Sequence, residues 1–439
     1  MTYLLKGATL VTLDPRAVSR GDLRINNGMI EARAERLERR KGDEVIDLTG
    51  KLIMPGMVCA HTHLYSSLAR GMPAPPRTPT NFKEILELVW WRLDRSLDEE
   101  TIYLSAIAGA LDAASSGTTC LFDHHASPAH ILGSLQIVRE AIEKVGLRAV
   151  LCYEVTDRGG VQEREKGLDE NLAFLEWSRD ALATSSPENP ALFRAMVGAH
   201  ASFTLSDESL EYCAELMKVF DAGLHIHVAE DRWDVVDASS RYRLEVVERL
   251  EKRRALNSRT LLAHGIHLSD EDIARARSAN VWVAHNPRSN MNNQVGYAPV
   301  AKFGDRLVLG TDGIGANMFD EARVAFFRAR DARVEFGADD WLAVLAANQR
   351  LASDAFGGDL VGLRVGSIAD IVVLDYASPT PVTSENLAWH FVFGIDSSSV
   401  ESVMVNGRFV IRNRAFPFDV AALYERARLA TEKLWAKLR

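Results

Sequence analysis

Cysteine is scarce in this 439-residue sequence, which contains only four. No two of them have the Cys-x-x-Cys spacing of a zinc or redox motif, so a cysteine-based metal site is not expected. All four lie in or beside apolar runs: Cys59, Cys120, Cys152 and Cys213. This pattern predicts buried free thiols in a reducing compartment. Cys59 precedes a histidine pair by two residues, but we do not expect it to bind a metal.

The sequence also lacks long hydrophobic runs. No run approaches the roughly 18 apolar residues of a membrane-spanning helix, so no membrane partner is expected. The first residues, MTYLLKGATLVTLDPR, are typical of a strand and not of a signal peptide, which favours a cytoplasmic location. The formal net charge of −9 provides no basic footprint for nucleic acid. These absences give no indication of a membrane or nucleic-acid partner.

Both ends of the chain carry β-strand patterns. Asn26-Asn27-Gly28 lies between apolar residues and predicts a hairpin, because Asn and Gly accept the positive φ of a tight turn. Near the other end, Ile368–Leu374 is typical of a strand, and Asn406-Gly407 predicts a second hairpin. Two β-rich ends around one long middle predict a small β-sandwich domain assembled from both termini.

The middle of the chain alternates short apolar runs with amphipathic helical patterns such as Glu99–Ala114 and Leu244–Arg254. The runs lie near Met57–His61, Cys120–Asp123, Ala149–Tyr153, Ala195–Ala199, Leu224–Val228, Leu261–His264, Val281–Ala284 and Leu307–Gly310. Eight such alternations predict a parallel sheet, and eight parallel strands can close into a barrel. The expected fold class is therefore α/β, with a (β/α)8 TIM-like barrel.

These patterns divide the chain into four expected parts. The N-terminal part of the β-sandwich covers 1–56, the barrel 57–358, the C-terminal part of the sandwich 359–418, and an amphipathic helix 419–439. An insertion at 65–97 follows the first run and is either a lid over the active site or a packed surface excursion. The last helix is expected to pack on its own subunit or on a neighbour, and we expect a homo-oligomer.

Histidines gather at the ends of the apolar runs. Eleven of the twelve fall between residues 61 and 285. Catalytic groups collect at the carboxyl ends of barrel strands. His61 and His63 follow the first run, and side chains two apart on a strand point the same way, so both imidazoles can meet one ion. Alone, this pair also fits two structural histidines.

Three further motifs end the fifth, sixth and eighth runs. His227 and Glu230 follow the fifth run; His225 lies two residues before His227, and spacing alone leaves open which of the two binds. We favour His227 because it is nearer the strand end. His264 ends the sixth run, and Asp312 ends the eighth within Gly-Thr-Asp-Gly. Each motif alone also fits a structural role: a strand histidine, a helix cap or an Asp-Gly turn.

Together the four motifs predict one metal centre. Three imidazoles and a carboxylate suit Zn²⁺, and Fe²⁺ is also possible. A divalent ion lowers the pKa of bound water to about 7, so hydroxide becomes available at neutral pH. The residues therefore predict hydrolytic chemistry.

These motifs resemble the amidohydrolase superfamily, in its cytosine-deaminase-like and chlorohydrolase-like branch. The resemblance covers nearly the whole chain and rests on PGMVCAHTHLYSSLARG, HIHVAE, LLAHGIHL, HNPRSNM, GTDG and the late ADIVVLD strand. WWRLDRSLDEE and FDHHASPAHI resemble aminohydrolases of the SsnA type. The resemblance implies a hydrolytic deaminase that releases ammonia from an amino-substituted purine, pyrimidine or related ring.

The resemblance also implies roles for individual residues. His61, His63, His227 and Asp312 match the metal ligands, and Asp312 matches the base that takes a proton from the metal's water. Glu230 matches the acid that protonates the ring, and His264 matches the histidine that orients the hydroxide. Candidates for shaping the substrate pocket are Tyr65, Arg70, His124, His125 and His200. One of His124 and His125 instead caps a helix or packs below the pocket in the alternative interpretation.

One departure from the family bears on the metal count. Binuclear members carry a carbamylated lysine at the end of strand 4, where this chain has Val-Gly-Ala-His-Ala-Ser, so one metal is expected. Glu154 is expected to be a pocket or structural carboxylate, with a bridge to a second ion as the alternative. His285–Asn290 is expected to support the loop after the seventh strand.

Two other functions fit the same residues. One is cleavage of a C–N amide, or of a halide or alkylamine substituent on a triazine-like ring. Release of ammonia separates deamination from both. The other is a catalytically silent scaffold relative, which absence of bound metal would favour.

Overall fold

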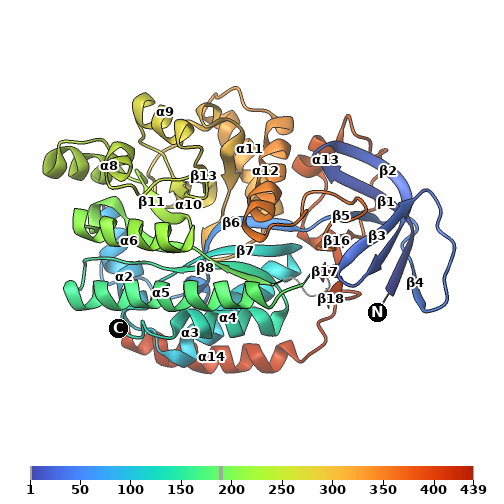
Figure 1. The fold of residues 1–439 in the computed structure, drawn as a ribbon, viewed down its shortest axis with the longest axis horizontal. Coiled ribbons are helices and arrows are strands. Elements are labelled where there is room, and N and C mark those ends of the chain that lie inside the picture. Colours follow the sequence, from blue (N-terminus) through green and yellow to red (C-terminus); the bar gives the residue numbers. More distant parts are fainter. Residues whose placement is uncertain (1, 187–190, 439) are drawn as a thin grey trace.

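The computed structural model describes residues 2–186 and 191–438 and has a mixed α/β fold. Figure 1 shows two regions: helices cover a group of central strands, and a sheet made from both ends of the chain lies beside them. Helix α14 (Val420–Lys437) runs along the outside of the helical region. The expected α/β class is confirmed.

The terminal sheet has eight strands in the order β18-β17-β16-β5-β1-β2-β3, with β4 beside β1. Their bounds are β1 (Thr2–Leu13), β2 (Arg16–Asn26), β3 (Met29–Ala34), β4 (Asp43–Asp47), β5 (Leu52–Pro55), β16 (Ile371–Leu374), β17 (Val400–Val405) and β18 (Arg408–Ile411). The N-terminal and C-terminal strands meet where β5 pairs antiparallel with β16. A separate hydrophobic cluster, which includes Leu10, Ile25 and Val373, fills the core of this region. Strands from both ends of the chain therefore share one sheet.

Both predicted hairpin turns are present, and they lie against each other. Asn27 and Gly28 have φ of 49° and 80°, and Asn406 and Gly407 have 49° and 68°. A Cβ on Gly407 would lie 2.8 Å from the Cα of Gly28, so this contact requires glycine. Ala369 joins the two turns, because its N–H donates to Gly28 O and its carbonyl accepts from Gly407 N.

Two parallel sheets form the centre of the helical region. Their orders are β15-β6-β7-β8-β9 and β10-β11-β12-β13-β14. The strands are β6 (Met57–His63), β7 (Thr118–His125), β8 (Arg148–Tyr153), β9 (Phe193–Ala195), β10 (Val197–Ala201), β11 (Leu224–Val228), β12 (Leu261–His264), β13 (Trp282–His285), β14 (Leu307–Leu309) and β15 (Asp312–Gly313). All eight predicted runs are strands, but the fourth and the eighth are each divided in two. In both, one half pairs with one sheet and the second half with the other.

Helices follow most of the parallel strands. The longer ones are α3 (Glu99–Ser115), α4 (Ser134–Val145), α5 (Val161–Ala183), α6 (Asp207–Phe220), α9 (Asp270–Ser278), α11 (Met318–Asp331), α12 (Ala338–Phe356) and α14. The shorter ones are α1 (Phe82–Ile85), α2 (Trp91–Asp94), α7 (Arg232–Asp237), α8 (Val246–Lys252), α10 (Pro287–Asn292) and α13 (Leu387–Phe393). Short 3₁₀ and π segments are η1 (Leu64–Ala69), η2 (Leu86–Trp90), η3 (Ser202–Thr204), η4 (Ala238–Tyr242), η5 (Val300–Lys302), η6 (Gly304–Arg306) and η7 (Ser397–Ser399). Three helices expected from the sequence are present: α3 corresponds to Glu99–Ala114, α8 to Leu244–Arg254 and α14 to the amphipathic helix at 419–439.

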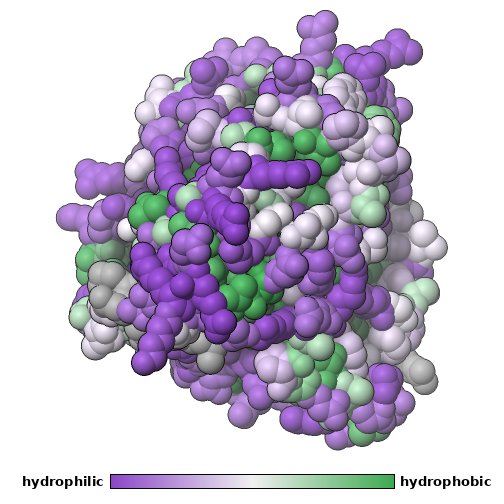
Figure 2. Space-filling model, turned by 90° about the vertical axis from the view of Figure 1, so that its right-hand side faces the viewer, coloured by the Kyte–Doolittle hydropathy of each residue, from purple (hydrophilic) through white to green (hydrophobic). Residues whose placement is uncertain are grey.

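Helix α14 packs on its own chain. The indole N–H of Trp435 donates to Leu68 O at 3.1 Å, and the Lys437 ammonium lies 2.9 Å from Asp98. Among the described residues, no helix combines the length and the apolar character that crossing a membrane requires. Figure 2 shows the side of the molecule on which the terminal sheet lies: hydrophilic side chains cover most of it, and hydrophobic ones form separate patches.

A buried ion pair joins the central strands to the terminal sheet. Arg148 on β8 donates to both carboxylate oxygens of Asp370, at 2.8 and 3.1 Å, and both side chains are at most 3% exposed. Asp370 also accepts from the N–H of Asn406 at 2.7 Å.

We expect Asp370→Ala to lower the free energy of unfolding by about 3–5 kcal/mol, because it leaves a buried guanidinium without its counter-charge. Urea unfolding followed by circular dichroism measures this change. Asp375→Ala is the matched control, because Asp375 is 54% exposed and lies 3.9 Å from Arg414. An equal unfolding midpoint for the two variants would contradict the prediction.

Candidate metal centre

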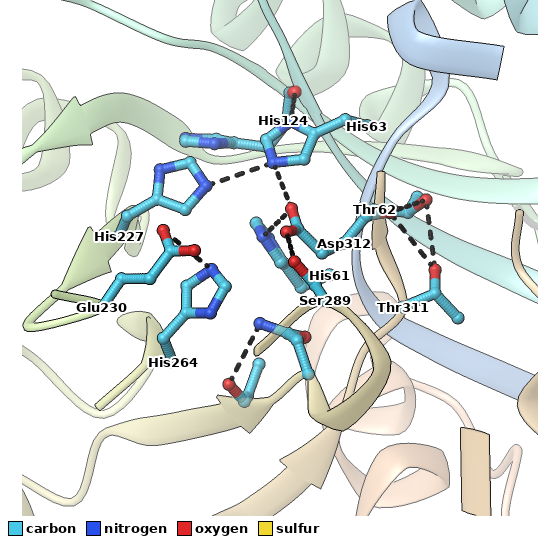
Figure 3. A network of polar contacts seen from close by, with 12 residues as sticks. His61, Thr62, His63, His124, His227, Glu230, His264, Ser289, Thr311 and Asp312 are labelled. Atoms are coloured by element: carbon cyan, nitrogen blue, oxygen red, sulfur yellow. Dashed lines mark hydrogen bonds and ion pairs between the residues drawn. The ribbon is translucent and has the colours of Figure 1, made fainter. Parts of the chain in front are cut away.

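Three imidazoles and one carboxylate converge at the carboxyl ends of the parallel strands (Figure 3). His61 and His63 point the same way from β6, and His227 reaches them from β11. Asp312 begins β15, which pairs with β6 so that Asp312 lies opposite Thr62. His63 Nε2 is 3.0 Å from Asp312 Oδ1 and 3.1 Å from His227 Nε2, and His61 Nε2 is 3.4 Å from Asp312 Oδ1.

The second nitrogen of each imidazole is already engaged. His63 Nδ1 donates to the backbone oxygen of His124 at 2.6 Å, and His227 Nδ1 donates to that of His200 at 2.6 Å. His61 Nδ1 is 2.8 Å from His225 Nε2. The two carbonyl acceptors place a proton on Nδ1 of His63 and of His227, so that each neutral ring turns an Nε2 lone pair toward the cluster. Of the two histidines of β11, His225 contacts His61 Nδ1, and His227 lies with its Nε2 against His63 Nε2.

This arrangement fits a divalent cation. Ligands about 2.0–2.2 Å from one ion lie about 3.0–3.5 Å apart, which matches the separations between these side chains. His61 Nε2 is buried and has no hydrogen-bond partner within the part of the chain that the structure describes. Burial lowers the pKa of His61 to about 3 and that of His227 well below its usual value, which favours the neutral imidazoles that a metal needs. Burial also lowers the pKa of His63, but the carboxylates of Asp312 and Glu154 outweigh burial and raise that pKa well above its usual value. Ligand atoms of His124 and His264 also lie within 4.8 Å of others in this cluster.

The backbone at two strand ends is in the left-handed region. His264 has φ of 76° and Asp312 has φ of 59°. Such conformations cost on the order of 1–3 kcal/mol each and gather at functional sites. Gly310 lets the eighth run approach β6, because a Cβ there would lie 2.7 Å from the Cβ of His61.

Glu230 and His264 form a second polar pair beside the cluster. His264 Nε2 is 3.5 Å from Glu230 Oε2, and His264 Nδ1 donates to Asn290 Oδ1 at 2.8 Å. Asn293 donates to Glu230 Oε1 at 3.2 Å. Burial raises the pKa of Glu230 to about 7. A carboxyl with this pKa can carry a proton at neutral pH and give it away.

The segment after the seventh strand contributes more than loop support. Ser289 donates to Asp312 Oδ2, and Asn290 and Asn293 orient His264 and Glu230. Sequence reasoning placed His285–Asn290 in a supporting role and did not single out Asn293. The only feature of the sequence that could have identified Ser289, Asn290 and Asn293 is their position after the seventh predicted strand, between the motifs of His264 and Asp312.

A pocket opens above the cluster and is partly walled by the 65–97 insertion. Five residues of that insertion line it: Phe82, Leu86, Trp90, Trp91 and Asp94. Spacing in the sequence did not identify these residues. The insertion therefore covers the site, as the lid interpretation requires; whether it opens and closes remains a prediction.

The five predicted pocket residues are placed differently from one another. Tyr65 and His200 line the pocket. Arg70 does not: its side chain is 64% exposed and pairs with Asp112 at 3.2 Å. His124 and His125 are fully buried outside the lining, where His124 Nε2 donates to His225 O and His125 Nε2 bonds to the Ser127 hydroxyl.

Glu154 lies at the end of β8 and lines the same pocket. Its Oε1 is 3.2 Å from Nδ1 of both His63 and His124. Burial opposes ionisation of Glu154, but His124 and the hydrogen bonds outweigh it and hold the pKa of the carboxyl well below its usual value. Cys59 is buried against His61 O and Thr311 and is not among the clustered ligand atoms of the described residues, as expected. All four cysteines are free and buried, also as expected.

Comparison with known proteins decides the family. The profile of the Amidohydrolase family matches residues 52–410. The chain belongs to the amidohydrolase family. The matched region contains every residue of the centre described above, so the resemblance inferred from the motifs is confirmed.

Curated relatives of this amidohydrolase are similar over most of its length. A 5-methylthioadenosine/S-adenosylhomocysteine deaminase from Desulforudis audaxviator is 31% identical, over 85% of this chain and 84% of the relative. A 5'-deoxyadenosine deaminase from Methanosarcina acetivorans is 30% identical, over 99% and 98%. A 5'-deoxyadenosine deaminase from Methanobrevibacter smithii is 28% identical, over 99% and 98%.

Solved structures share the fold of this amidohydrolase at lower identity. An adenosine deaminase from Xanthomonas campestris with bound zinc has a TM-score of 0.85 and 20% identity, covering 99% of this chain and 98% of the other. The atrazine chlorohydrolase TrzN from Arthrobacter aurescens, complexed with zinc, has a TM-score of 0.81 and 22% identity, covering 99% and 100%.

Proposed function

We propose that this amidohydrolase is a metal-dependent hydrolytic deaminase of an amino-substituted nitrogen heterocycle, such as a purine, a pyrimidine or a related ring. The observation that carries the proposal is the convergence of three Nε2 atoms and one carboxylate beside a carboxyl with a pKa of about 7. The deaminase names of the curated relatives support it.

His61, His63, His227 and Asp312 are the ligands that would hold one divalent ion, with Zn²⁺ preferred and Fe²⁺ as the alternative. The nitrogen-rich donor set and the zinc in the solved neighbours support this preference. When bound, the ion lowers the pKa of water to about 7 and so supplies hydroxide at neutral pH.

The chain's own residues then move the protons. The Asp312 carboxylate, oriented by the Ser289 hydroxyl, accepts a proton from the attacking water, and His264 stabilises the tetrahedral centre. Glu230 donates a proton to the ring nitrogen next to the carbon under attack. Asp312 passes its proton to the amino group, the C–N bond breaks, and ammonia leaves. The proton of the added hydroxyl group returns to the Glu230 carboxylate as the ring carbonyl forms. Tyr65 and His200 hold the ring.

The finer architecture is part of the proposal. The two parallel sheets share the fourth and eighth runs at both edges, which supports a closed (β/α)8 barrel over 57–358. The separate core of the terminal sheet supports a β-sandwich from 1–56 and 359–418, with the helix at 419–439 packed on the barrel. The homo-oligomer and the cytoplasmic location remain predictions.

We expect kcat/KM for deamination to fall above about pH 7, because Glu230 acts as an acid only while protonated and burial raises its pKa to about 7. The rate should drop about tenfold for each pH unit above the pKa, as the protonated fraction does. Initial rates measured between pH 6 and 9 test this. Residual activity of Glu230→Gln should lack this limb, and a wild-type profile that stays flat to pH 9 would count against the assignment.

A screen for ammonia release tests the function itself. Metal-loaded protein is incubated with oxopurines, aminopyrimidines, pterins, aminotriazines and 5'-deoxyadenosine, and ammonia, halide and alkylamine are measured separately. Ammonia from one of these rings is the expected result. Halide or alkylamine release without ammonia would replace deamination by substituent cleavage. Metal-free protein after growth and purification with Zn²⁺ would favour the scaffold role.

A further inference from the structure

The pocket walls are acidic and aromatic. Six aromatic side chains line it: Tyr65, Phe82, Trp90, Trp91, Phe203 and Trp233. Carboxylates line it as well, whereas no lysine or arginine belongs to the lining that the described residues form. Flat apolar walls suit a planar ring, and an acidic lining disfavours a phosphate or carboxylate on that ring.

Two residues of the pocket lining, Glu154 and His200, each provide a hydrogen-bond acceptor. One is Glu154: its Oε1 lies 3.2 Å from Nδ1 of both His63 and His124, whereas its Oε2 lies 3.9 Å from His200 Nε2. That distance is too long for a hydrogen bond. Oε2 therefore keeps its capacity to accept from a ligand.

The second acceptor is His200 Nε2. The Thr204 hydroxyl has one hydrogen and donates it to Ala201 O at 3.0 Å, because a carbonyl can only accept. The hydroxyl must then accept from His200 Nδ1, 2.8 Å away, which places the imidazole proton on Nδ1. His200 Nε2 consequently presents a lone pair to the pocket.

Two acceptors 3.9 Å apart can both be satisfied by a hydrogen-bond donor on the substrate. We propose that Glu154 and His200 select rings that carry an N–H on the edge away from the reacting carbon, such as a lactam N–H or an unsubstituted azole N–H. Rings with only acceptors on that edge, such as an N-substituted adenine, leave both groups unpaired. This inference rests on the proposed function and gives its substrate class.

The unpartnered atoms nearby are consistent with a polar ligand. Asp94 Oδ1 and Trp91 Nε1 are buried at the pocket wall and have no hydrogen-bond partner among the described residues. The lining therefore offers a third acceptor, from Asp94, and a donor, from Trp91. A buried polar atom without a partner is unfavourable, so a ligand that carries both a donor and an acceptor can satisfy both atoms.

The test compares a ring that bears the N–H with its deaza analogue, in which C–H replaces N–H at almost the same size. In the wild type, we expect the analogue to lose at least about 100-fold in kcat/KM, because a site built to bind a donor rejects a ligand that lacks it. In Glu154→Ala the two compounds should differ by less than about fivefold. Glu154→Gln should also lose the preference, since an amide can donate.

Three further measurements keep the outcomes distinct. Metal content must equal that of the wild type; loss of metal in both Glu154 variants would show that Glu154 acts through His63 and would overturn the selective role. Glu211→Gln, on the exposed face of α6, is the control and should keep the wild-type preference. An unchanged preference in Glu154→Ala would also overturn the proposal.

Binding of the same two compounds can be followed by tryptophan fluorescence, because Trp90 and Trp91 line the pocket. This measurement tests the selection even if no ring releases ammonia.

Discussion

Removal of the metal with a chelator is expected to abolish ammonia release, and added Zn²⁺ is expected to restore it. Without the ion, nothing in the pocket supplies hydroxide at neutral pH, because the pKa of free water is near 15.7. Dialysis against a chelator, metal analysis of the dialysed protein and an ammonia assay before and after reconstitution measure the effect.

The ligand set can be tested in the same assay. His227→Ala should bind less than one ion per chain and lose at least about 10⁴-fold in kcat, since catalysis by a positioned metal supplies several kcal/mol. His130→Ala is the matched control, because His130 lies outside the cluster of ligand atoms among the described residues. Full turnover by metal-free protein would end the assignment of this centre.

Glu230→Gln is expected to lower kcat by about 10³-fold, within the 10²–10⁴-fold range of general acid–base catalysis. The amide keeps the size of the side chain and can still contact Asn293, but it has no proton of suitable acidity for the ring nitrogen. Metal content and the midpoint of thermal unfolding should stay at wild-type values, because Glu230 is not a proposed ligand.

Glu211→Gln serves as the control for this change of charge. A Glu230→Gln protein that holds its metal and retains full kcat would require another acid, and His264, 3.5 Å from Glu230, would be the next candidate. A loss of metal in Glu230→Gln would instead place the side chain in the ligand set.

The elements with a strong local pattern were predictable. The two Asn-Gly turns require positive φ at both residues, and the apolar runs had the length of buried parallel strands. His61 and His63 share a face because side chains alternate along a strand, which spacing alone reveals. Their convergence with Asp312 depends on pairing between β6 and β15, which no local pattern encodes.

The parts that could not be predicted depend on side-chain direction and on loops. Arg70 follows a strand as expected, but it lies just after the 3₁₀ segment η1, which ends at Ala69. The Arg70 side chain therefore points to Asp112 and solvent and not into the pocket. Trp90 and Trp91 lie in an insertion whose sequence has no strand-like or helix-like hydrophobic pattern. The sequence therefore did not predict that their side chains line the pocket. His225 and His227 were distinguishable only through the bonds of their ring nitrogens.

The pairing of β5 with β16 has a consequence for synthesis on the ribosome. Residues 52–55 emerge early, but their partner at 371–374 emerges only after the whole central region. At about 5–20 residues per second, the edge of β5 stays unpaired for on the order of tens of seconds. An exposed apolar edge of this kind can template aggregation, so nascent chains are expected to need chaperone cover until the last strands arrive.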